Sequence, residues 1–335
     1  MALLAAKPLA VTLGDPAGVG PEIVAAAWRA LRASGPAFFA VGDARTLAAA
    51  GARVAVIADA VEAGARFGEA LPVLDAPLSA LPVPGQPSAE AAPFVVRWIE
   101  SAVQLALDGA AAGVVTAPIA KASLYAAGFA FPGHTEFIGE LTRSAPMPGA
   151  RGPVMMLAAG DLRAALVTVH EPLARVPQLV TEARIVSTGM VVAEALARDF
   201  GVARPRIAVA GLNPHAGEGG ALGREDVEVV APAVAVLKAR GVDARGPLPS
   251  DSLFHAAARA TYDAALCLYH DQALIPVKML DFWGGVNLTL GLPIVRTSPD
   301  HGTAFDIAGK GVARPDSLIA AIRLAAEIAT RRQAA

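Results

Sequence analysis

The chain has 335 residues, of which 54% are hydrophobic and 17% charged, and its formal net charge is −2. This length allows two packed lobes or one large α/β domain, and the composition excludes a disordered chain. The longest apolar runs, such as Val229–Leu237, are far shorter than the roughly 20 residues that a membrane helix needs, and the absence of a basic run argues against nucleic acid as a partner.

The first residues, MALLAAKPLAVTLGDP, are not typical of a secretion signal, because Lys7 interrupts a short apolar start and a Gly-Asp-Pro turn follows. The single cysteine, Cys267, excludes an intramolecular disulfide, and its apolar surroundings favour a small buried side chain over a nucleophile. We therefore expect a soluble, cytoplasmic protein without a membrane partner.

In chain order, the first part alternates strands and helices. Residues 8–13 predict a strand, and the turn GDPAGVGPEI leads into a helix with Pro21 in its first turn. Alanine-rich helical stretches separate further strands, expected at Phe38–Val41, Val54–Ile57 and Gly113–Thr116. The prolines of Ala76–Ala92 predict an irregular segment, and a long helix is expected at Pro93–Leu107. This alternation is typical of an α/β fold with a largely parallel sheet.

The glycine-rich turn after the first strand lacks a standard dinucleotide fingerprint. Its glycines are Gly14, Gly18 and Gly20, but Ile23 occupies the position of the third glycine in G-x-G-x-x-G. There is also no Gly-Lys-Ser/Thr sequence for a phosphate-binding P-loop. A nucleotide would therefore have to bind in another way.

A turn with the sequence FPGHTEF places His134 and Thr135 at an expected helix start. Thr135 could cap that helix, or both residues could donate hydrogen bonds to an anion. The residues alone leave these two alternatives open.

Histidines follow three of the four strands expected in the middle of the chain. These strands are Val154–Leu157, Ala164–Val169, Ile207–Leu212 and Ala264–Tyr269, and the histidines are His170, His215 and His270. Because strands of an open α/β sheet deliver polar groups to its carboxyl edge, three imidazoles could meet there and bind a transition metal with one position open. The alternative is that each histidine is structural.

Two further loops and the last segment are informative. The glycine-rich loop Asn213–Arg224 could wrap a ligand or only turn the chain, and Asp251 follows Ser250 at a helix start where capping is the common role. The segment Leu268–Gly311 combines histidine, lysine, asparagine, arginine and a glycine-rich loop, a density that favours function. A C-terminal amphipathic helix is expected at Pro315–Ala335.

Seven motifs in order resemble the 4-hydroxythreonine-4-phosphate dehydrogenase family of vitamin B6 biosynthesis. They are GDPAGVGPEI, PGHTEF, VTVHEPL, GLNPHAGEGG with LGRE, GPLPSD, YHDQALIPVK and VNLTLGLPIVRTSPDHGTAFDIAGKG, and they span Gly14 to Gly311. The resemblance implies an isocitrate/isopropylmalate-dehydrogenase-like fold of two α/β/α lobes with the active site in the cleft between them. On this basis we expect residues 1–132 plus 283–335 in a first lobe and residues 133–282 in a second.

The resemblance also implies a set of site residues. One divalent metal per subunit, zinc, cobalt or magnesium, would be held by His170, His215 and His270. Substrate contacts would come from His134, Thr135, Lys278, Asn287 and Arg296. The sequence DHGTAFDIAGKG is similar to the HGSAPDIAGKG loop of isopropylmalate dehydrogenases, which binds the adenosine end of NAD; here the loop residues would be His301, Gly302, Thr303, Asp306 and Ile307. A homodimer with its active site at the subunit interface is also implied.

The family reaction oxidises a secondary alcohol β to a carboxylate, and the resulting β-keto acid decarboxylates to 3-amino-2-oxopropyl phosphate. Lys278 would be a proton donor to the enolate or an anion contact, and Asp251 and Asp271 are candidate proton carriers or partners of the metal ligands. NAD is expected over NADP, because Asp306 would repel a 2′-phosphate. Two alternatives remain: a paralogue acting on phosphorylated threonate or a related sugar acid, and a non-catalytic metal- or phosphate-binding module.

Overall fold

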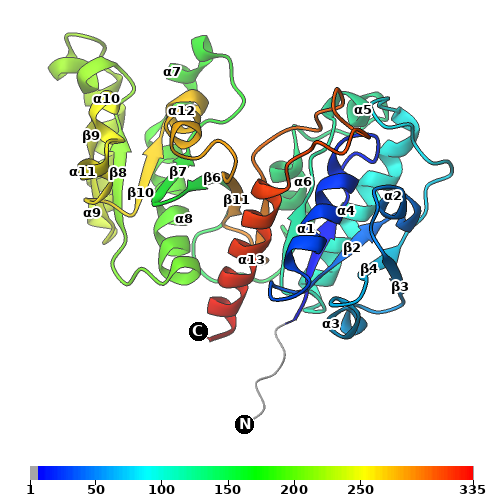
Figure 1. The fold of residues 1–335 in the computed structure, drawn as a ribbon. Coiled ribbons are helices and arrows are strands. Elements are labelled where there is room, and N and C mark those ends of the chain that lie inside the picture. The colour runs from blue at the N-terminus through cyan, green and yellow to red at the C-terminus, as the bar shows by residue number, and fades with distance from the viewer. Residues whose placement is uncertain (1–6, 335) are drawn as a thin grey trace. The chain divides into compact units, whose positions relative to one another are not determined.

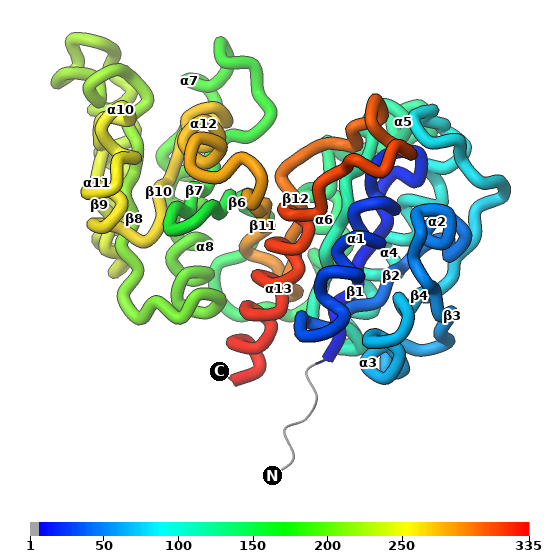
Figure 2. The backbone as a smooth tube through the Cα atoms, in the orientation of Figure 1, coloured from blue at the N-terminus to red at the C-terminus, as the bar shows by residue number. Residues whose placement is uncertain are grey.

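The computed structural model describes residues 7–334 and divides the chain into two compact units. The first unit runs to Pro146 and includes Leu292–Gln333, and the second contains Met147–Gly291. The chain thus leaves the first unit, builds the second and returns, a path that can be followed in Figure 2. These boundaries put His134 in the first unit and Asn287 in the second, whereas the expected boundaries assign each to the other.

The first unit is built on a sheet in which all neighbouring strands are parallel. Its order is β3-β4-β2-β1-β5-β12. Figure 1 labels β2, β3 and β4 of this sheet. The strands are β1 (Leu9–Thr12), β2 (Phe38–Gly42), β3 (Val54–Ile57), β4 (Leu71–Asp75), β5 (Val114–Thr116) and β12 (Arg296–Pro299). Five of the six, all but β3, are largely buried, and their apolar sequences suit a parallel sheet covered on both faces.

Amphipathic helices cover this sheet. They are α1 (Gly20–Leu31), α2 (Ala44–Ala49), α3 (Ala63–Arg66), α4 (Ala92–Leu107), α5 (Lys121–Ala126), α6 (His134–Leu141) and α13 (Asp316–Ala334). In α1, Pro21 occupies the first turn as expected, and the stripe Val24, Ala27, Trp28 and Leu31 is buried. The turn before α1 requires glycine, because Gly14 has a φ of 66° and a Cβ there would lie 2.2 Å from the carbonyl oxygen of Pro118.

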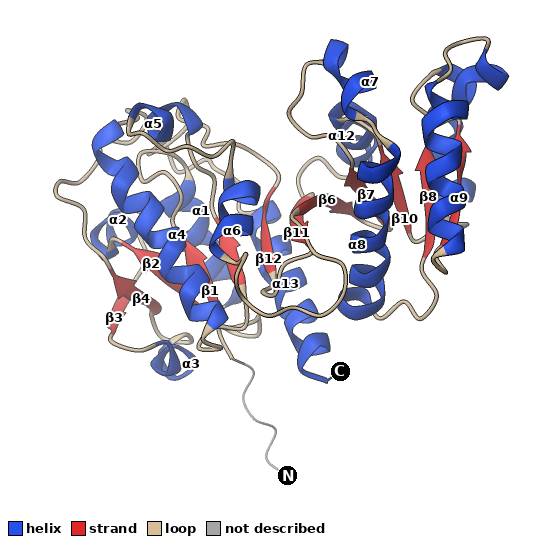
Figure 3. Cartoon of the chain, turned by 180° about the vertical axis from the view of Figure 1, so that it is seen from behind, coloured by secondary structure: helices blue, strands red, loops and turns tan. Residues whose placement is uncertain are grey.

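The second unit has a mixed sheet with the order β11-β6-β7-β10-β8-β9. Its strands are β6 (Val154–Ala159), β7 (Leu162–Leu166), β8 (Arg206–Ala210), β9 (Asp243–Leu248), β10 (Ala264–Cys267) and β11 (Val286–Leu290). The pairs β11–β6 and β6–β7 are antiparallel, and the remaining pairs are parallel. Its helices are α7 (Val176–Leu179), α8 (Glu182–Phe200), α9 (Ala231–Ala239), α10 (Ser250–Leu253), α11 (Ala256–Arg259) and α12 (His270–Leu280), and α8 and α12 lie on opposite faces of the sheet (Figure 3).

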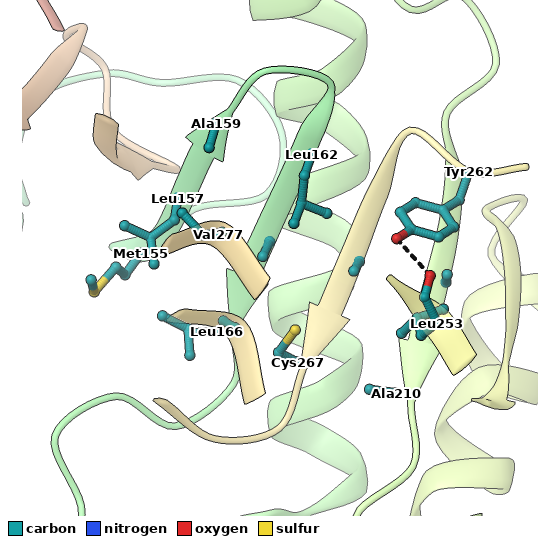
Figure 4. Packing of buried hydrophobic residues seen from close by; sticks show 14 residues of the cluster. Met155, Leu157, Ala159, Leu162, Leu166, Ala210, Leu253, Tyr262, Cys267 and Val277 are labelled. Carbon is teal, nitrogen blue, oxygen red and sulfur yellow. Dashed lines mark hydrogen bonds between the residues drawn. The ribbon is translucent and has the colours of Figure 1, made fainter. Parts of the chain in front are cut away.

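The core under α12 is built from every second residue of the strands that it covers (Figure 4). Met155, Leu157 and Ala159, every second residue of β6, point into one cluster. Cys267 is fully buried in the same cluster, and burial raises the pKa of its thiol, so the expectation of a small buried side chain is confirmed. The Tyr262 hydroxyl donates to the carbonyl of Leu253 at 3.1 Å, which satisfies the one polar atom of that ring.

The expected elements recur with shifted ends, and four strands were not expected. Three of the unexpected strands, β4, β9 and β11, contain residues that favour turns or polar surroundings, such as Pro72, Pro247 and Asn287. The fourth, β12, contains Arg296, which we expected to serve the substrate rather than a sheet. Ala76–Ala92 is irregular as predicted, apart from a short 3-10 turn at Ala89–Ala91 and from Ala92, which begins α4. Among the described residues, none of the helices has the length and apolarity to span a membrane.

Candidate functional site

The three histidines follow three neighbouring parallel strands of the second unit. In the order β7-β10-β8, His170 follows β7, His270 follows β10 and His215 follows β8. All three therefore leave the sheet at the same edge, as the strand pattern predicted. The rings of His170 and His270 lie together, with centroids 5.6 Å apart.

His215 lies in an unusual backbone turn. Its φ is 53°, and Ala216, Gly217, Glu218 and Gly219 also have positive φ values, between 44° and 78°. Left-handed backbone costs each non-glycine residue roughly 1–2 kcal/mol, so surrounding contacts must hold the turn. The fully buried Asp226 anchors the chain just before this turn: its carboxylate accepts the backbone N–H of Leu212 at 2.7 Å and that of Asn213 at 3.0 Å. The carbonyl of Asn213 in turn accepts the N–H of Ala216 at 3.1 Å.

Carboxylates orient two of the three imidazoles. Asp271 Oδ1 lies 2.7 Å from His270 Nδ1, and Glu218 Oε2 lies 3.1 Å from His215 Nδ1. A carboxylate that accepts from Nδ1 fixes the tautomer in which Nε2 carries the lone pair, the arrangement of metal-binding histidines in proteins. The donor chemistry thus fits a transition metal, and nitrogen ligands favour zinc or cobalt over magnesium.

The geometry brings two of these ligands together. Within residues 7–334, the structure contains no group of three histidine, cysteine, aspartate or glutamate side chains already close enough to hold a metal ion. His170 and His270 are adjacent, whereas His215 projects from the left-handed turn with 64% of its side chain exposed. The three-histidine metal site therefore stays a prediction.

A buried glutamine that the sequence reasoning missed ties the three loops together. Gln272 accepts the N–H of Leu268 at 2.6 Å and donates to the carbonyl of Gly211 at 2.7 Å and to Ser250 Oγ at 2.8 Å. It thus joins the start of α12 to the loops after β8 and β9. The sequence offered one signal for Gln272: it is a polar residue two positions after His270, on the buried side of α12.

The other predicted site residues of the second unit, Lys278, Asn287 and Asp251, differ in their burial and contacts. Lys278 is half-buried in α12, with its Nζ 5.2 Å from the ring centre of Phe282. Asn287, in β11, has a buried Oδ1 without a hydrogen-bond partner among the described residues. Asp251 is exposed in the first turn of α10 and does not cap that helix.

In the first unit, His134 and Thr135 form the first turn of α6, and Arg296 begins β12. The helix has Gly133 at its N-cap without a side-chain cap, so Thr135 does not have the capping role. Arg296 is 3% exposed and donates to Thr116 Oγ1 at 2.7 Å, and burial lowers its pKa to about 10. His134 Nε2 is buried without a partner in the described part of the chain. The pKa of His134 is lowered, mainly by burial and to a smaller extent by the positive charges of Arg296 and Lys121.

The segment predicted to bind the cofactor packs on the turn before α1. The carbonyl of Thr303 accepts the N–H of Val19 at 2.9 Å, and the carboxylate of Glu22 accepts the N–H groups of Gly309 and Gly311. His301 is exposed, with Nδ1 3.0 Å from the carbonyl of Gly302, itself exposed, and Ile307 closes a turn by donating its N–H to the carbonyl of Ala304. Asp306 is exposed and makes no hydrogen bond or ion pair with any residue that the structure describes.

A cavity of about 400 Å³ lies beside this segment. It is lined by Glu22, Gly309 and Gly311, by the turn before α1, by α2 and by residues 81–84. Its size is within the range of pockets that bind small molecules and cofactors, about 300–1,000 Å³.

Comparisons with known proteins agree on one class. Residues 35–325 match the family described as the pyridoxal phosphate biosynthetic protein PdxA. The chain is 65% identical to 4-hydroxythreonine-4-phosphate dehydrogenase of Caulobacter vibrioides, covering 98% of this chain and 99% of that protein. The crystal structure of the Klebsiella pneumoniae enzyme of the same name has a TM-score of 0.86 at 41% identity, covering 98% and 99% of the two chains.

A more distant solved structure is the terephthalate 1,2-cis-dihydrodiol dehydrogenase of Burkholderia xenovorans LB400, with a TM-score of 0.64 at 28% identity, covering 96% of this chain and 98% of that one. Fold and relatives together define a dehydrogenase, an oxidoreductase that acts on a CH–OH group with a nicotinamide cofactor. The chain belongs to the 4-hydroxythreonine-4-phosphate dehydrogenase family of pyridoxal phosphate biosynthesis. The expected family and the α/β, isocitrate/isopropylmalate-dehydrogenase-like fold class are confirmed.

Proposed function

We propose that this chain uses NAD and one bound divalent metal ion to oxidise 4-(phosphooxy)-L-threonine. The β-keto acid formed would lose carbon dioxide to give 3-amino-2-oxopropyl phosphate. The observation that carries the metal part is that a histidine follows each of three neighbouring parallel strands at the same edge of the sheet, with His170 and His270 adjacent and His270 held by Asp271. His170, His215 and His270 would hold the metal, which supplies Lewis acidity to the substrate oxygen.

The side chains of the chain have distinct roles in this proposal. Arg296 presents a permanent positive charge to an anionic group of the substrate, and His134 and Thr135 donate hydrogen bonds to it. Lys278 supplies the proton to the enolate left by decarboxylation, or else contacts an anion. The buried, unpartnered Oδ1 of Asn287 accepts a hydrogen bond from a substrate hydroxyl or amine.

Asp271 and Asp251 have different roles in this proposal. The contact between Asp271 and His270 Nδ1 supports a positioning role for Asp271, because its carboxylate is already engaged. Asp251 is exposed and keeps the role of a candidate proton carrier.

For the cofactor, we propose NAD, which accepts the hydride, with His301, Gly302, Thr303, Asp306 and Ile307 on its adenosine side. The exposed carboxylate of Asp306, without a partner in the described residues, is able to accept hydrogen bonds from ribose hydroxyls and would repel a 2′-phosphate. The cavity beside Gly309 offers space of the size a nucleoside needs.

We also propose a homodimer with its active site at the subunit interface. Supporting this, Ile275, Met279, Phe282 and Trp283 are large apolar side chains in and just after α12, and each is more than half exposed. Such a patch beside Lys278 suits a second copy of the chain better than water. Light scattering at micromolar concentration should give twice the chain mass; a fully active monomer would exclude the shared site.

We also propose that the protein is located in the cytoplasm.

A substrate panel tests the activity. The purified enzyme is given NAD, a divalent metal and either 4-(phosphooxy)-L-threonine or phosphorylated threonates, and NADH absorbance is followed. Fastest turnover of the first substrate supports the proposal, preference for a threonate supports the paralogue, and no turnover with any of them supports a binding module. His170→Ala, His215→Ala and His270→Ala should each lose turnover and bound metal while the fold is retained, and full metal content in all three would refute the metal site.

A further inference from the structure

The first unit holds a lysine that none of these roles uses. Lys121 begins α5, shortly after the end of β5, and its side chain is exposed. It makes no hydrogen bond or ion pair with the residues described here. A lysine in this state is ordinarily a solvated surface charge, so its surroundings decide whether it has a role.

Those surroundings are the start of α6. A Cβ built on Gly133, the N-cap of that helix, would lie 3.6 Å from Cε and 3.8 Å from Nζ of Lys121. The same point is 3.5 Å from Oε2 of Glu136. The ammonium of Lys121 therefore lies beside Gly133 at the N-terminus of α6, and its charge acts on His134 in the first turn of that helix.

The end of this sheet offers several groups to an anion. The N-terminus of α6 carries the positive end of a helix dipole, and His134 Nε2 is buried there without a partner in the described chain. Thr12 and Thr116 are register partners at the ends of β1 and β5, and Thr12 Oγ1 is also buried and unpartnered among the described residues. An unpartnered buried polar atom calls for a ligand or water, because its desolvation is otherwise uncompensated.

The balance of charge around α6 shows what Lys121 adds. Arg296 is buried, and the charge of Glu136 acts on it, raising its pKa against the larger effect of burial. One arginine and one glutamate cancel, whereas a phosphate monoester carries about −1.5 to −2 charges at neutral pH. Lys121, whose charge also reaches His134, supplies the excess positive charge.

We propose that Lys121 is a further substrate-positioning residue, the second cation beside Arg296 for the phosphate group of the substrate. This inference rests on the proposed phosphorylated substrate. Because the phosphate ester is neither formed nor broken in the reaction, the ammonium of Lys121 contributes to binding and orientation rather than to the chemical step.

Three variants test it. Lys121→Gln removes the charge, Lys121→Arg restores it, and Lys238→Gln removes a matched exposed lysine from the last turn of α9 in the second unit. Calorimetry with inorganic phosphate, and in parallel with acetate, is run on the full chain without substrate or NAD. Steady-state kinetics with 4-(phosphooxy)-L-threonine gives KM and kcat separately, and thermal melts monitor the fold.

We expect Lys121→Gln to raise both the phosphate Kd and the substrate KM about 10- to 100-fold, the range of one charge-assisted hydrogen bond, with kcat nearly unchanged. Lys121→Arg should recover most of this loss, and Lys238→Gln should equal the wild type. Unchanged phosphate Kd and KM in Lys121→Gln, or a loss confined to acetate, would overturn the assignment. If phosphate binding depends on Lys121 but the wild type does not oxidise the substrate, the proposed function fails and the phosphate site stands.

Discussion

One carboxylate anchors the chain just before the left-handed turn that carries His215, and the strength of this anchor can be measured. Asp226 accepts the N–H groups of Leu212 and Asn213, and its Oδ2 also accepts Asn213 Nδ2 at 3.0 Å. Asp226→Ala removes all three bonds and leaves two backbone N–H groups without acceptors. Each unsatisfied donor costs roughly 1–3 kcal/mol, and since these two are only partly buried, water recovers some of the loss, so we expect about 2–4 kcal/mol in total.

Urea denaturation gives the free energy of unfolding, and calorimetry with zinc gives the metal affinity. Asp226→Ala should lose about 2–4 kcal/mol of stability and bind zinc more weakly, because the turn no longer holds His215 in place. Glu225→Gln is the matched control: Glu225 also accepts Asn213 Nδ2, at 2.9 Å, but contacts neither backbone N–H. A stability within about 0.5 kcal/mol of the wild type for Asp226→Ala would refute this reasoning.

Two further predictions concern pH and cofactor choice. The pKa of His134 is lowered in the folded chain below its ordinary 6.5, so the unfolded chain binds the proton more readily and stability falls as the pH drops through about 6.5. Urea denaturation between pH 5 and 8 should show this loss in the wild type and a weaker one in His134→Gln; equal slopes would contradict it. For Asp306→Ala, the preference for NAD over NADP, expressed as the free-energy difference from the two kcat/KM values, should shrink by about 1–3 kcal/mol. An unchanged preference would assign Asp306 to a structural role.

The sequence predicted which strands would carry histidines to one edge, because apolar strands ending in a polar residue are a local signal. It did not predict where the strands stop. β10 ends at Cys267 rather than Tyr269: the carbonyl of Leu268 still accepts the N–H of Thr168, but the N–H of Leu268 bonds to the side chain of Gln272. Nor could it identify Asp226, whose partners are the backbone N–H groups of another loop. Such contacts depend on tertiary structure and leave no periodic pattern.

The boundary between the units was hard to place for a similar reason. His134 follows an irregular turn, and Asn287 is the one half-buried residue of an otherwise buried strand. Neither setting indicates the unit to which the residue belongs. Only the packing of α6 against α4, and the pairing of β11 with β6, assign them.

The interrupted path of the first unit has a consequence for synthesis on the ribosome. The last strand of its sheet, β12, pairs with β5, yet Arg296 and its partner Thr116 are 180 residues apart in the chain. At a synthesis rate of roughly 5–20 residues per second, about 10–40 s pass between the synthesis of β5 and that of β12. During that interval an apolar parallel strand has an open edge, and the buried guanidinium of Arg296 is not yet part of the sheet. The second unit, contiguous from Met147 to Gly291, can fold in the meantime, so the nascent chain acquires its histidine-bearing sheet before it can complete the one that carries Arg296.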